Sequence, residues 1–410
     1  MHHSGRNDTV ILFTARIVRL FCYGFLSVVL ALYLIQVGLS ETVIGLIFTL
    51  TLAGDAGVSL WLTTSADRFG RKRTLIAGAL LMIGAGVVFI FTRNPVALAV
   101  AAVMGVISPS GNEIGPFLSV EQAALTQLLP GERRTQIFAW YALAGSLSTA
   151  TGALAGGWLA QGLQGSGFSA FNAYRVVLAG YALGGLILIG LFLLLSPAVE
   201  VEPAGEVEQK LFLGLHRSRS VVMRLSGLFA MDAFGGALLV QSLLAYWFHV
   251  KYGVDTGVLG TIFFGANILA GLSALSAARI AKRFGLINTM VFTHIPSNIL
   301  LILVPLMPNL PLAIAALLAR FSISQMDVPT RQSYTMAVVS PDERSAASGV
   351  TTIARSIGAA LSPSLAGYLM SVPALFSVPF FLSGGLKILY DVLLYKSFRG
   401  LKPPEEKVMR

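Results

Sequence analysis

ADRFGRKRTL, residues 66–75, is a short basic stretch that separates two long apolar runs. The run before it begins near residue 41, and the run after it continues from Thr74 to Thr92. A run of about 20 apolar residues is long enough for a helix to cross the hydrocarbon core of a bilayer. Gly70 permits the tight turn that so short a connection requires. The stretch therefore predicts a polar turn between two transmembrane helices.

Twelve apolar runs of this kind can be counted along the 410 residues. They begin near residues 10, 41, 74, 95, 135, 171, 221, 255, 286, 309, 345 and 374. Charged residues make up only 12% of the chain, about half their usual share in a soluble domain, and hydrophobic residues make up 55%. A soluble fold of this length could not bury so much apolar surface. We therefore expect an all-α membrane protein with twelve transmembrane helices.

The distribution of basic residues indicates how the chain lies in the membrane. If both termini are cytoplasmic, three basic residues fall in outer loops: Arg93, Arg175 and Lys251. Thirteen fall in inner loops: Arg68, Arg71, Lys72, Arg73, Arg133, Arg134, Lys210, Arg217, Arg219, Arg279, Lys282, Arg283 and Arg344. Cytoplasmic loops of membrane proteins carry such an excess of Lys and Arg. This rule explains the net charge of +10 without a nucleic-acid partner, and it predicts cytoplasmic termini.

The chain contains an internal repeat. Residues 66–75 align with residues 281–290, and five of the ten positions are identical. The spacing of Gly38, Val43 and Gly45 recurs 215 residues later in Gly253, Val258 and Gly260. A polar stretch, residues 197–220, lies near the middle of the chain. We therefore predict an N-terminal six-helix bundle at 1–196, a cytoplasmic linker at 197–220, a C-terminal bundle at 221–398 and a cytoplasmic tail at 399–410.

Two six-helix halves, with this loop after the second helix, resemble the major facilitator superfamily. The family's signature loop reads Gly-x-Leu-Ala and then Asp-Arg-x-Gly-Arg-Arg/Lys, although Thr63 and Ser65 here replace the first Gly and Leu. The resemblance covers essentially the whole chain and implies two pseudo-symmetric bundles that rock about a midplane substrate site. It also implies a cytoplasmic latch formed by the loop; the alternative is that these basic residues only set topology. The matching residues are Asp67, Arg68, Gly70, Arg71 and Lys72.

The fifth apolar run carries a second, weaker motif. Residues 148–157 resemble the antiporter pattern Gly-x-x-x-Gly-Pro-x-x-Gly-Gly, which implies efflux by exchange for protons. The matching glycines are Gly152, Gly156 and Gly157, whereas Ser148 and Ala153 replace the first Gly and the Pro. The alternative is that the small residues only let two helices pack closely.

Six charged residues are predicted to lie at mid-membrane depth. A charge there costs at least about 2.5–3.5 kcal/mol, so it marks a functional site by default. We expect these side chains to line the cavity and couple transport to protons, with Glu121 as the first proton carrier, followed by Asp232 and Asp55. The six are Glu121, Asp232, Asp55, Asp327, Arg331 and Arg355.

Several pairings within this set can be expected. Asp327 and Arg331 are four residues apart and share a helical face, so they form either a cavity pair or a static ion pair. Glu121 and Arg331 occupy nearly equivalent places in the two halves, and we expect Glu121 to face Arg331. Arg16 and Arg19 are expected to extend to the inner interface.

Three further expectations concern residues near the outer surface and the helix breaks. Glu113 is expected to be solvated near the outside, and His294 to lie near an outer helix end. Pro329 is expected to interrupt the tenth helix.

The expected function is secondary active transport of a small organic solute, with proton-coupled efflux preferred. One alternative is proton-coupled uptake of an organic anion or metabolite, where Arg331 and Arg355 favour an anion as the substrate. The other is a receptor that keeps the fold without transport. No phosphate-binding Gly-Lys-Ser/Thr loop and no paired Cys/His spacing occur, so we expect no enzyme, no cofactor and no metal. We expect a monomer in the cell (inner) membrane of a prokaryote, with lipid, protons and a small solute as its partners.

Overall fold

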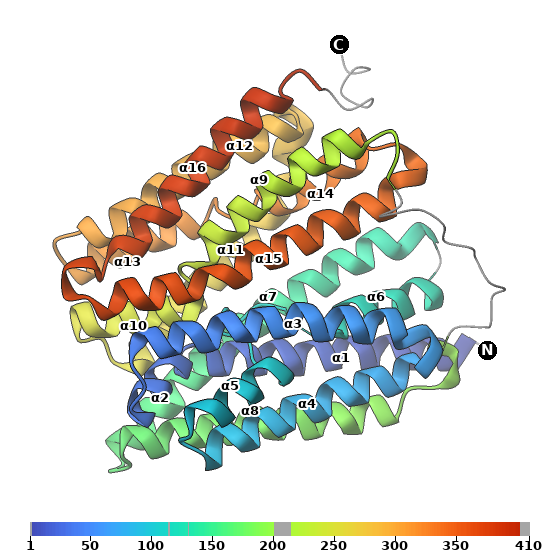
Figure 1. The fold of residues 1–410 in the computed structure, drawn as a ribbon. Coiled ribbons are helices and arrows are strands. Elements are labelled where there is room, and N and C mark those ends of the chain that lie inside the picture. Colours follow the sequence, from blue (N-terminus) through green and yellow to red (C-terminus); the bar gives the residue numbers. More distant parts are fainter. Residues whose placement is uncertain (1, 114, 130, 201–214, 402–410) are drawn as a thin grey trace. The chain divides into compact units, whose positions relative to one another are not determined.

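The computed structural model describes residues 2–113, 115–129, 131–200 and 215–401. At residues 2–6, 63–65, 67–68, 131–136, 341 and 345 it describes the backbone only. Throughout the described ranges the chain forms helices and no strand, as Figure 1 shows, and the predicted all-α class is confirmed.

The helices of the first half begin where the apolar runs predict, within about four residues for all but the first. They are α1 His2–Ser27, α2 Leu30–Val37, α3 Glu41–Phe69, α4 Arg71–Phe91, α5 Pro95–Met104, α6 Phe117–Leu128, α7 Gly131–Gly165 and α8 Ala170–Leu193. A short 3-10 helix, Pro197–Val199, follows α8. Residues 201–214 of the predicted linker lie outside the described residues.

The second half repeats this plan. Its helices are α9 Arg219–Ala237, α10 Gln241–Tyr252, α11 Thr256–Phe284, α12 Leu286–Leu303, α13 Leu310–Phe321, α14 Asp327–Val338, α15 Arg344–Ser371 and α16 Val378–Phe398. Short 3-10 helices follow α12 at Val304–Leu306, precede α15 at Pro341–Glu343 and precede α16 at Pro373–Leu375. Of the predicted tail, residues 402–410 lie outside the described residues.

Twelve membrane spans result once the interrupted helices are joined. In the described chain, nine segments are long and apolar enough to cross a membrane by length and composition. The remaining three spans are α5 with α6, α13 with α14, and the less apolar α15. The predicted count of twelve is thus consistent with the observed helices.

Four spans are interrupted, and they are the first, fourth, seventh and tenth. The interruptions separate α1 from α2, α5 from α6, α9 from α10 and α13 from α14. The longest, residues 105–116, contains two prolines and two glycines with positive φ, Gly111 (70°) and Gly115 (82°). Since no water reaches a lipid-facing backbone, such breaks are tolerated only inside protein or beside a water-filled cavity.

The backbone of this longest interruption finds partners within the protein. The hydroxyl of Tyr181 donates to the carbonyl of Val106, and Ser242 donates to the carbonyl of Pro109 over 2.8 Å. In the tenth span the break falls at residues 322–326, not at Pro329 as expected. Pro329 lies in the first turn of α14, where a missing N–H costs no helical hydrogen bond.

The internal repeat is visible in the backbone. Gly38 and Gly253, which are 215 residues apart, end α2 and α10 in the left-handed conformation, with φ of 99° and 65°. Gly70 and Gly285, at the same separation, have φ of 95° and 87° before α4 and α12. A side chain would be strained at these positions. The two halves therefore turn with the same geometry at equivalent points.

By packing, the described chain divides into two compact units whose boundaries differ from the predicted halves. Unit 1 comprises residues up to Gly205 together with Val240–Asn267, and unit 2 comprises Glu206–Leu239 with Ile268 onward. Thus α10 and the start of α11 pack with the first half. Ser242 on α10, for example, donates to the carbonyl of Ser27 over 2.6 Å.

Close helix crossings organise unit 1. A Cβ at Gly152 or Gly156 of α7 would lie 2.1 Å from the carbonyl oxygen of Phe21 or Phe25 on α1. A Cβ at Gly157 would lie 2.3 Å from the carbonyl of Thr256. These three glycines therefore lie where α7 meets α1 and the start of α11, as expected of small residues at a helix interface.

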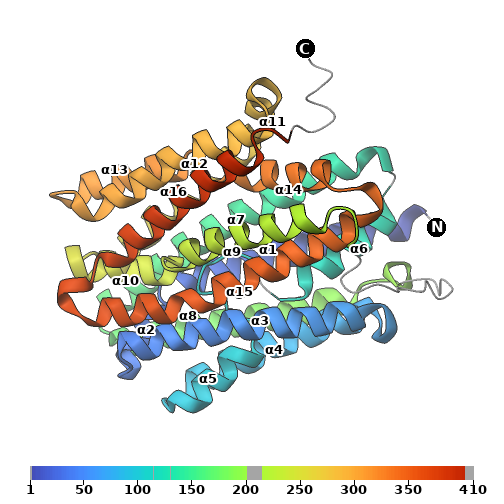
Figure 2. The same cartoon turned by 45° about the horizontal axis from the view of Figure 1, so that its top comes forward.

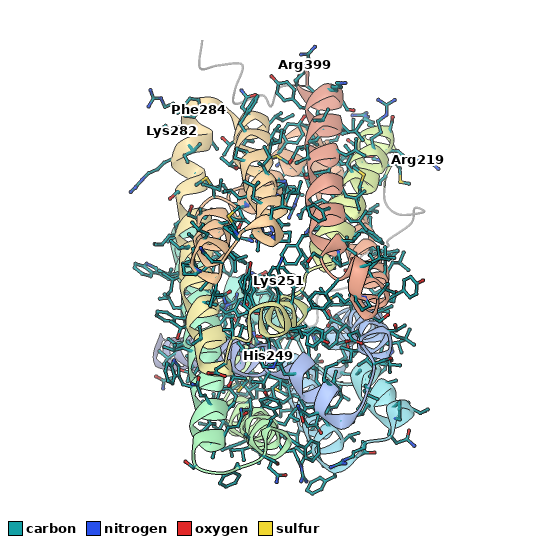
Figure 3. The ribbon with its side chains drawn as sticks, turned by 90° about the vertical axis from the view of Figure 1, so that its left-hand side faces the viewer. Arg219, His249, Lys251, Lys282, Phe284 and Arg399 are labelled. Carbon is teal, nitrogen blue, oxygen red and sulfur yellow. The ribbon has the colours of Figure 1, made fainter. Side chains whose placement is uncertain are left out.

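Unit 2 is built on two helix pairs. Figures 1 and 2 both show α12 beside α16 and α9 beside α15, and these are the strongest packings within the unit. An apolar cluster that includes Phe229, Met290, Tyr334 and Tyr390 fills the space between α9, α12, α14 and α16. Figure 3 shows Arg219, Lys282 and Arg399 at one end of the unit's helices. One end of unit 2 therefore carries Arg219 and Lys282, from two predicted cytoplasmic loops, and Arg399, from the predicted cytoplasmic tail.

Candidate functional site

A buried ion cluster lies inside unit 1. Both carboxylate oxygens of Glu121 on α6 accept hydrogen bonds from Arg19 on α1, over 2.6 and 2.7 Å, and the hydroxyl of Tyr141 on α7 donates to the same carboxylate. Arg19 and Glu121 are both fully buried. A bidentate Arg–carboxylate pair is the strongest geometry that these groups can adopt.

Glu113 extends this first cluster. It lies in the interruption between α5 and α6 and accepts hydrogen bonds from Arg16 over 2.7 Å and from Arg19 over 2.8 Å. Two arginines from one helix are thus compensated by two glutamates from one interrupted span. The expectations that the arginines reach the inner interface and that Glu113 is solvated are wrong. For Glu113 the expectation failed because depth was counted along a continuous helix, whereas the chain at Glu113 is not helical. For the arginines, which lie on the unbroken α1, it failed because their side chains turn toward Glu113 and Glu121 inside the unit.

Asp55 on α3 does not bond to the first ion cluster; it bonds to the non-helical segment between α5 and α6. Its carboxylate accepts from the backbone N–H of Gly115 over 2.5 Å and from the hydroxyl of Ser59 over 3.0 Å. Gly115 has a positive φ of 82°, so its N–H can turn toward α3. Asp55 therefore anchors the non-helical chain against its neighbour.

A second, larger ion cluster lies inside unit 2, around Asp232 on α9. Oxygen Oδ1 of Asp232 accepts from Lys387 on α16 over 2.6 Å. Oxygen Oδ2 accepts from Arg331 on α14 and from Arg355 on α15, each over 3.1 Å. Three cationic side chains from three helices therefore converge on one carboxylate that is 3% exposed.

Two further carboxylates complete this second cluster. Arg331 also donates to Asp327 over 2.8 Å, so the predicted pairing four residues apart is present. Asp391 on α16 lies 2.9 Å from the Nδ1 of His294 on α12. The second cluster thus consists of Asp232, His294, Asp327, Arg331, Arg355, Lys387 and Asp391.

The predicted residues divide between these clusters. Asp232, Asp327, Arg331 and Arg355 come together in unit 2, and Glu121 lies in unit 1. Glu121 was expected to pair with Arg331. In the structure, Glu121 accepts from Arg19 within unit 1, and Arg331 donates to Asp232 within unit 2.

Three members of the second cluster were missed from the sequence. Lys387 and Asp391 are charges four residues apart in the last apolar run, a signal that was available and not used. His294 was placed near an outer helix end, yet it is the ninth of the eighteen residues of α12 and only 4% exposed. The outer-end expectation for His294 is therefore wrong.

The signature loop has its own polar partners at the end of unit 1. The carboxylate of Glu200 accepts from the backbone N–H of Arg71 over 2.6 Å and of Lys72 over 3.2 Å, which caps the start of α4. The ammonium of Lys72 donates to the carbonyls of Leu193 and Leu195 at the end of α8. The side chains of Asp67 and Arg68 lie outside the described residues, so their role in a latch stays a prediction.

Comparison with known proteins adds family information. The family model described as Major Facilitator Superfamily matches residues 12–363. The chain is 32% identical, over 98% of its length and 96% of the relative's, to a protein of Saccharomyces cerevisiae named "Uncharacterized membrane protein YJR124C".

Solved structures match the fold over nearly the whole chain. The nucleoside transporter NupG aligns with a TM-score of 0.74 at 13% identity, covering 96% of this chain and 99% of that one. A D-xylose-proton symporter aligns with a TM-score of 0.69 at 14% identity, covering 95% and 97%. A bacterial homologue of the human lysosomal transporter Spinster aligns with a TM-score of 0.68 at 17% identity, covering 96% and 95%.

Proposed function

Because the chain belongs to the major facilitator superfamily, we propose that it is a secondary active transporter that moves a small organic solute by alternating access in exchange for protons. The observation that carries the proposal is the Asp232 carboxylate, on which cations from α14, α15 and α16 converge. A transporter needs ionisable groups that change partners, whereas a scaffold in lipid is more stable without them.

The arrangement suits proton coupling for an electrostatic reason. Asp232 holds four helices together through ion pairs, so protonating a carboxylate or an imidazole in the cluster would weaken specific links between helices. A proton that binds one arrangement better than another shifts the population toward it. The inward proton gradient would in this way drive a conformational change, and the degenerate glycine motif of α7 supports efflux as the direction.

The proposal is tested by reconstituting the full chain into liposomes that contain a pH-sensitive dye. Nucleosides, sugars, organic acids and drugs are first screened for thermal stabilisation, since a bound ligand raises apparent stability by mass action. A stabilising solute should then move protons in the opposite direction to its own flux. Asp232→Asn should abolish this coupling, whereas Asp255→Asn, the same change at an exposed position, should not. Binding without gradient-dependent flux would instead favour a receptor.

Uptake of an organic anion together with protons is the second candidate, and Arg355 favours it. Its side chain is 33% exposed although it donates to the buried Asp232. It can therefore offer further N–H groups to a carboxylate or phosphate. The two candidates differ in a way that does not depend on orientation in the liposome: a symported anion and its protons move in the same direction. Arg355→Gln should then weaken anion binding.

Localisation is proposed only at the level of an integral, multi-pass membrane protein with cytoplasmic termini. The relative at 32% identity is a yeast protein, so the expectation of a prokaryotic cell membrane has no support from it. A monomer remains the proposed state, to be checked by mass measurement of the purified protein.

A further inference from the structure

We propose that His294 is the proton-binding residue of this transporter and that it acts on Asp232 through Lys387. The inference deepens the proposed function and rests on it for its role in transport. It replaces Glu121 as the first candidate, because Glu121 is held by both Arg19 and Tyr141. The evidence for this inference is the hydrogen-bond geometry of the His294 imidazole.

The two ring nitrogens of His294 face groups of opposite charge. Nδ1 lies 2.9 and 3.1 Å from the two carboxylate oxygens of Asp391, which can only accept. Nε2 lies 3.4 Å from the ammonium nitrogen of Lys387, which can only donate. The network therefore assigns the proton to Nδ1 and a free lone pair to Nε2. His294 is a neutral base whose second nitrogen accepts from a lysine.

The charges of the second cluster balance in this state. Its three carboxylates face three permanent cations, and the imidazole contributes none. From the helices packed against α12, the charged groups are Lys387, Asp391 and, in its last turn, Lys396 on α16, Asp327 and Arg331 on α14, and Arg320 at the end of α13. Asp232 and Arg355 complete the set from α9 and α15. Among the described residues Arg320 forms no ion pair with a carboxylate, and the charge that acts on it is that of Asp327.

Adding a second proton to the ring changes the bonding. A proton from water binds Nε2, so this nitrogen becomes a donor and can no longer accept from Lys387. Two cations then lie about 3.4 Å apart and repel. Oδ1 of Asp232 lies 3.9 Å from Nε2, so a small movement would let the imidazolium compete with Lys387 for that oxygen.

The same carboxylate transmits the change to other helices. Oδ2 of Asp232 holds Arg331 and Arg355, so any displacement of Lys387 or Asp232 alters the ion pairs of α14 and α15. A histidine ordinarily changes charge between pH 5 and 8, unlike the other side chains of the cluster. An imidazole is therefore the group of this cluster best suited to respond to a physiological proton gradient.

The alternative is a buried histidine that only ties α12 to α16. NMR of the full-length protein, labelled with isotopes at histidine and reconstituted in lipid nanodiscs, distinguishes a proton-binding His294 from a purely structural one. The chain has five histidines, and the signal missing from His294→Gln identifies the ring. We expect this signal to change position as the pH is lowered from 8 to 5. In Lys387→Met its midpoint should rise by about one pH unit or more, because a like charge is removed. His249→Gln is the matched control, since its ring bonds a backbone carbonyl in unit 1.

Hydrogen exchange tests the transmission step. In the wild type and in His249→Gln, the protection of peptides from α9, α14 and α15 should change with pH, and the midpoint of this change should equal that of the His294 NMR signal. In His294→Gln the protection of these peptides should not show this change. A ring that keeps one protonation state from pH 5 to 8, or a midpoint unaffected by Lys387→Met, would overturn the inference. Neither measurement requires a substrate. Proton-coupled flux with a non-titrating His294 would refute this inference alone, and a titrating His294 without coupled flux would refute the proposed function.

Discussion

At the scale of single residues, the buried guanidinium of Arg19 sets the character of unit 1. It lies 4.5 Å over the ring of Phe117 and is bonded to two glutamates. These two ion pairs compensate a buried positive charge that would be unfavourable in the membrane without them. It also leaves Glu121 little freedom to exchange partners, which separates this first cluster from the second.

Glu121→Gln should therefore act first on stability. The substitution leaves Arg19 with half of its compensation inside the bundle, and breaking a buried pair costs about 3–5 kcal/mol. We expect a lower melting temperature in detergent. The double variant Arg19→Met with Glu121→Gln should recover much of the loss, because no unpaired charge remains. A single variant as stable as the wild type would show that this pair is dispensable for folding.

The same residues explain how much of the site could be predicted. The apolar runs, and the helices on which Asp232, Asp327 and Arg331 lie, follow from the sequence, because helix rise is regular where the helix is unbroken. Partners do not follow, since they depend on how each helix is rotated about its axis. Nothing local to Arg19 indicates that a glutamate from a distant, non-helical segment will meet it.

At the scale of helices, the crossing of α1 and α7 depends on missing side chains. A Cβ at Gly156 would lie 2.1 Å from the carbonyl oxygen of Phe25, and a backbone atom cannot move aside alone. Gly156→Ala should force the helices apart and cost about 1–3 kcal/mol. Gly162→Ala on the same helix meets no atom within 4 Å and should leave the melting temperature unchanged or higher. Equal effects of the two variants would contradict the role of the crossing.

Helix starts are a second element-scale feature, and Glu343 governs one of them. Its carboxylate accepts from the backbone N–H groups of His216, Arg217 and Ser218 just before α9. Burial would raise the pKa of Glu343, but the Ser218 hydroxyl and these N–H groups outweigh it and lower the pKa from 4.5 to about 2. An analogous cap, Glu200, holds the start of α4 in unit 1.

The lowered pKa gives a pH-dependent prediction. A depressed carboxylate contributes stability above its ordinary pKa and loses it as pH falls through the folded value. Glu343→Gln should therefore lower the melting temperature at pH 7, and the difference from wild type should shrink between pH 4.5 and about 2. Asp342→Asn, an exposed neighbour, is the control. A difference that is constant across this range would exclude the charged cap.

Where helices break was only partly readable from the sequence. Two prolines and two positive-φ glycines mark residues 105–116, but the break between α1 and α2 falls at Val28 and Val29, which have no such signal. Side chains from other helices satisfy the freed backbone, so tertiary contacts decide the site of the break. Pro329 shows the converse, because it starts a helix instead of ending one.

At the scale of the whole molecule, the repeat accounts for features that no single helix explains. Glycines 215 residues apart adopt the same left-handed turns, and the interrupted spans are the first, fourth, seventh and tenth. The two copies nevertheless carry different chemistry. Unit 1 seals its cluster with paired arginines and glutamates, whereas unit 2 adds a lysine and a histidine, so the proton-dependent step is assigned to one copy only.

An even number of spans requires both ends of the chain to face the same side, and the positive-inside rule predicts that this side is cytoplasmic. Ser166, in the turn between α7 and α8, should then face outward, and Arg399, after α16, should face inward; both are exposed. In a Cys22→Ala background, Ser166→Cys should react with an impermeant maleimide applied to the extracytoplasmic side of the membrane. Arg399→Cys should react only after permeabilisation. Labelling of both positions from the same side would require an even number of spans between them and would contradict the twelve-helix topology, which places an odd number there.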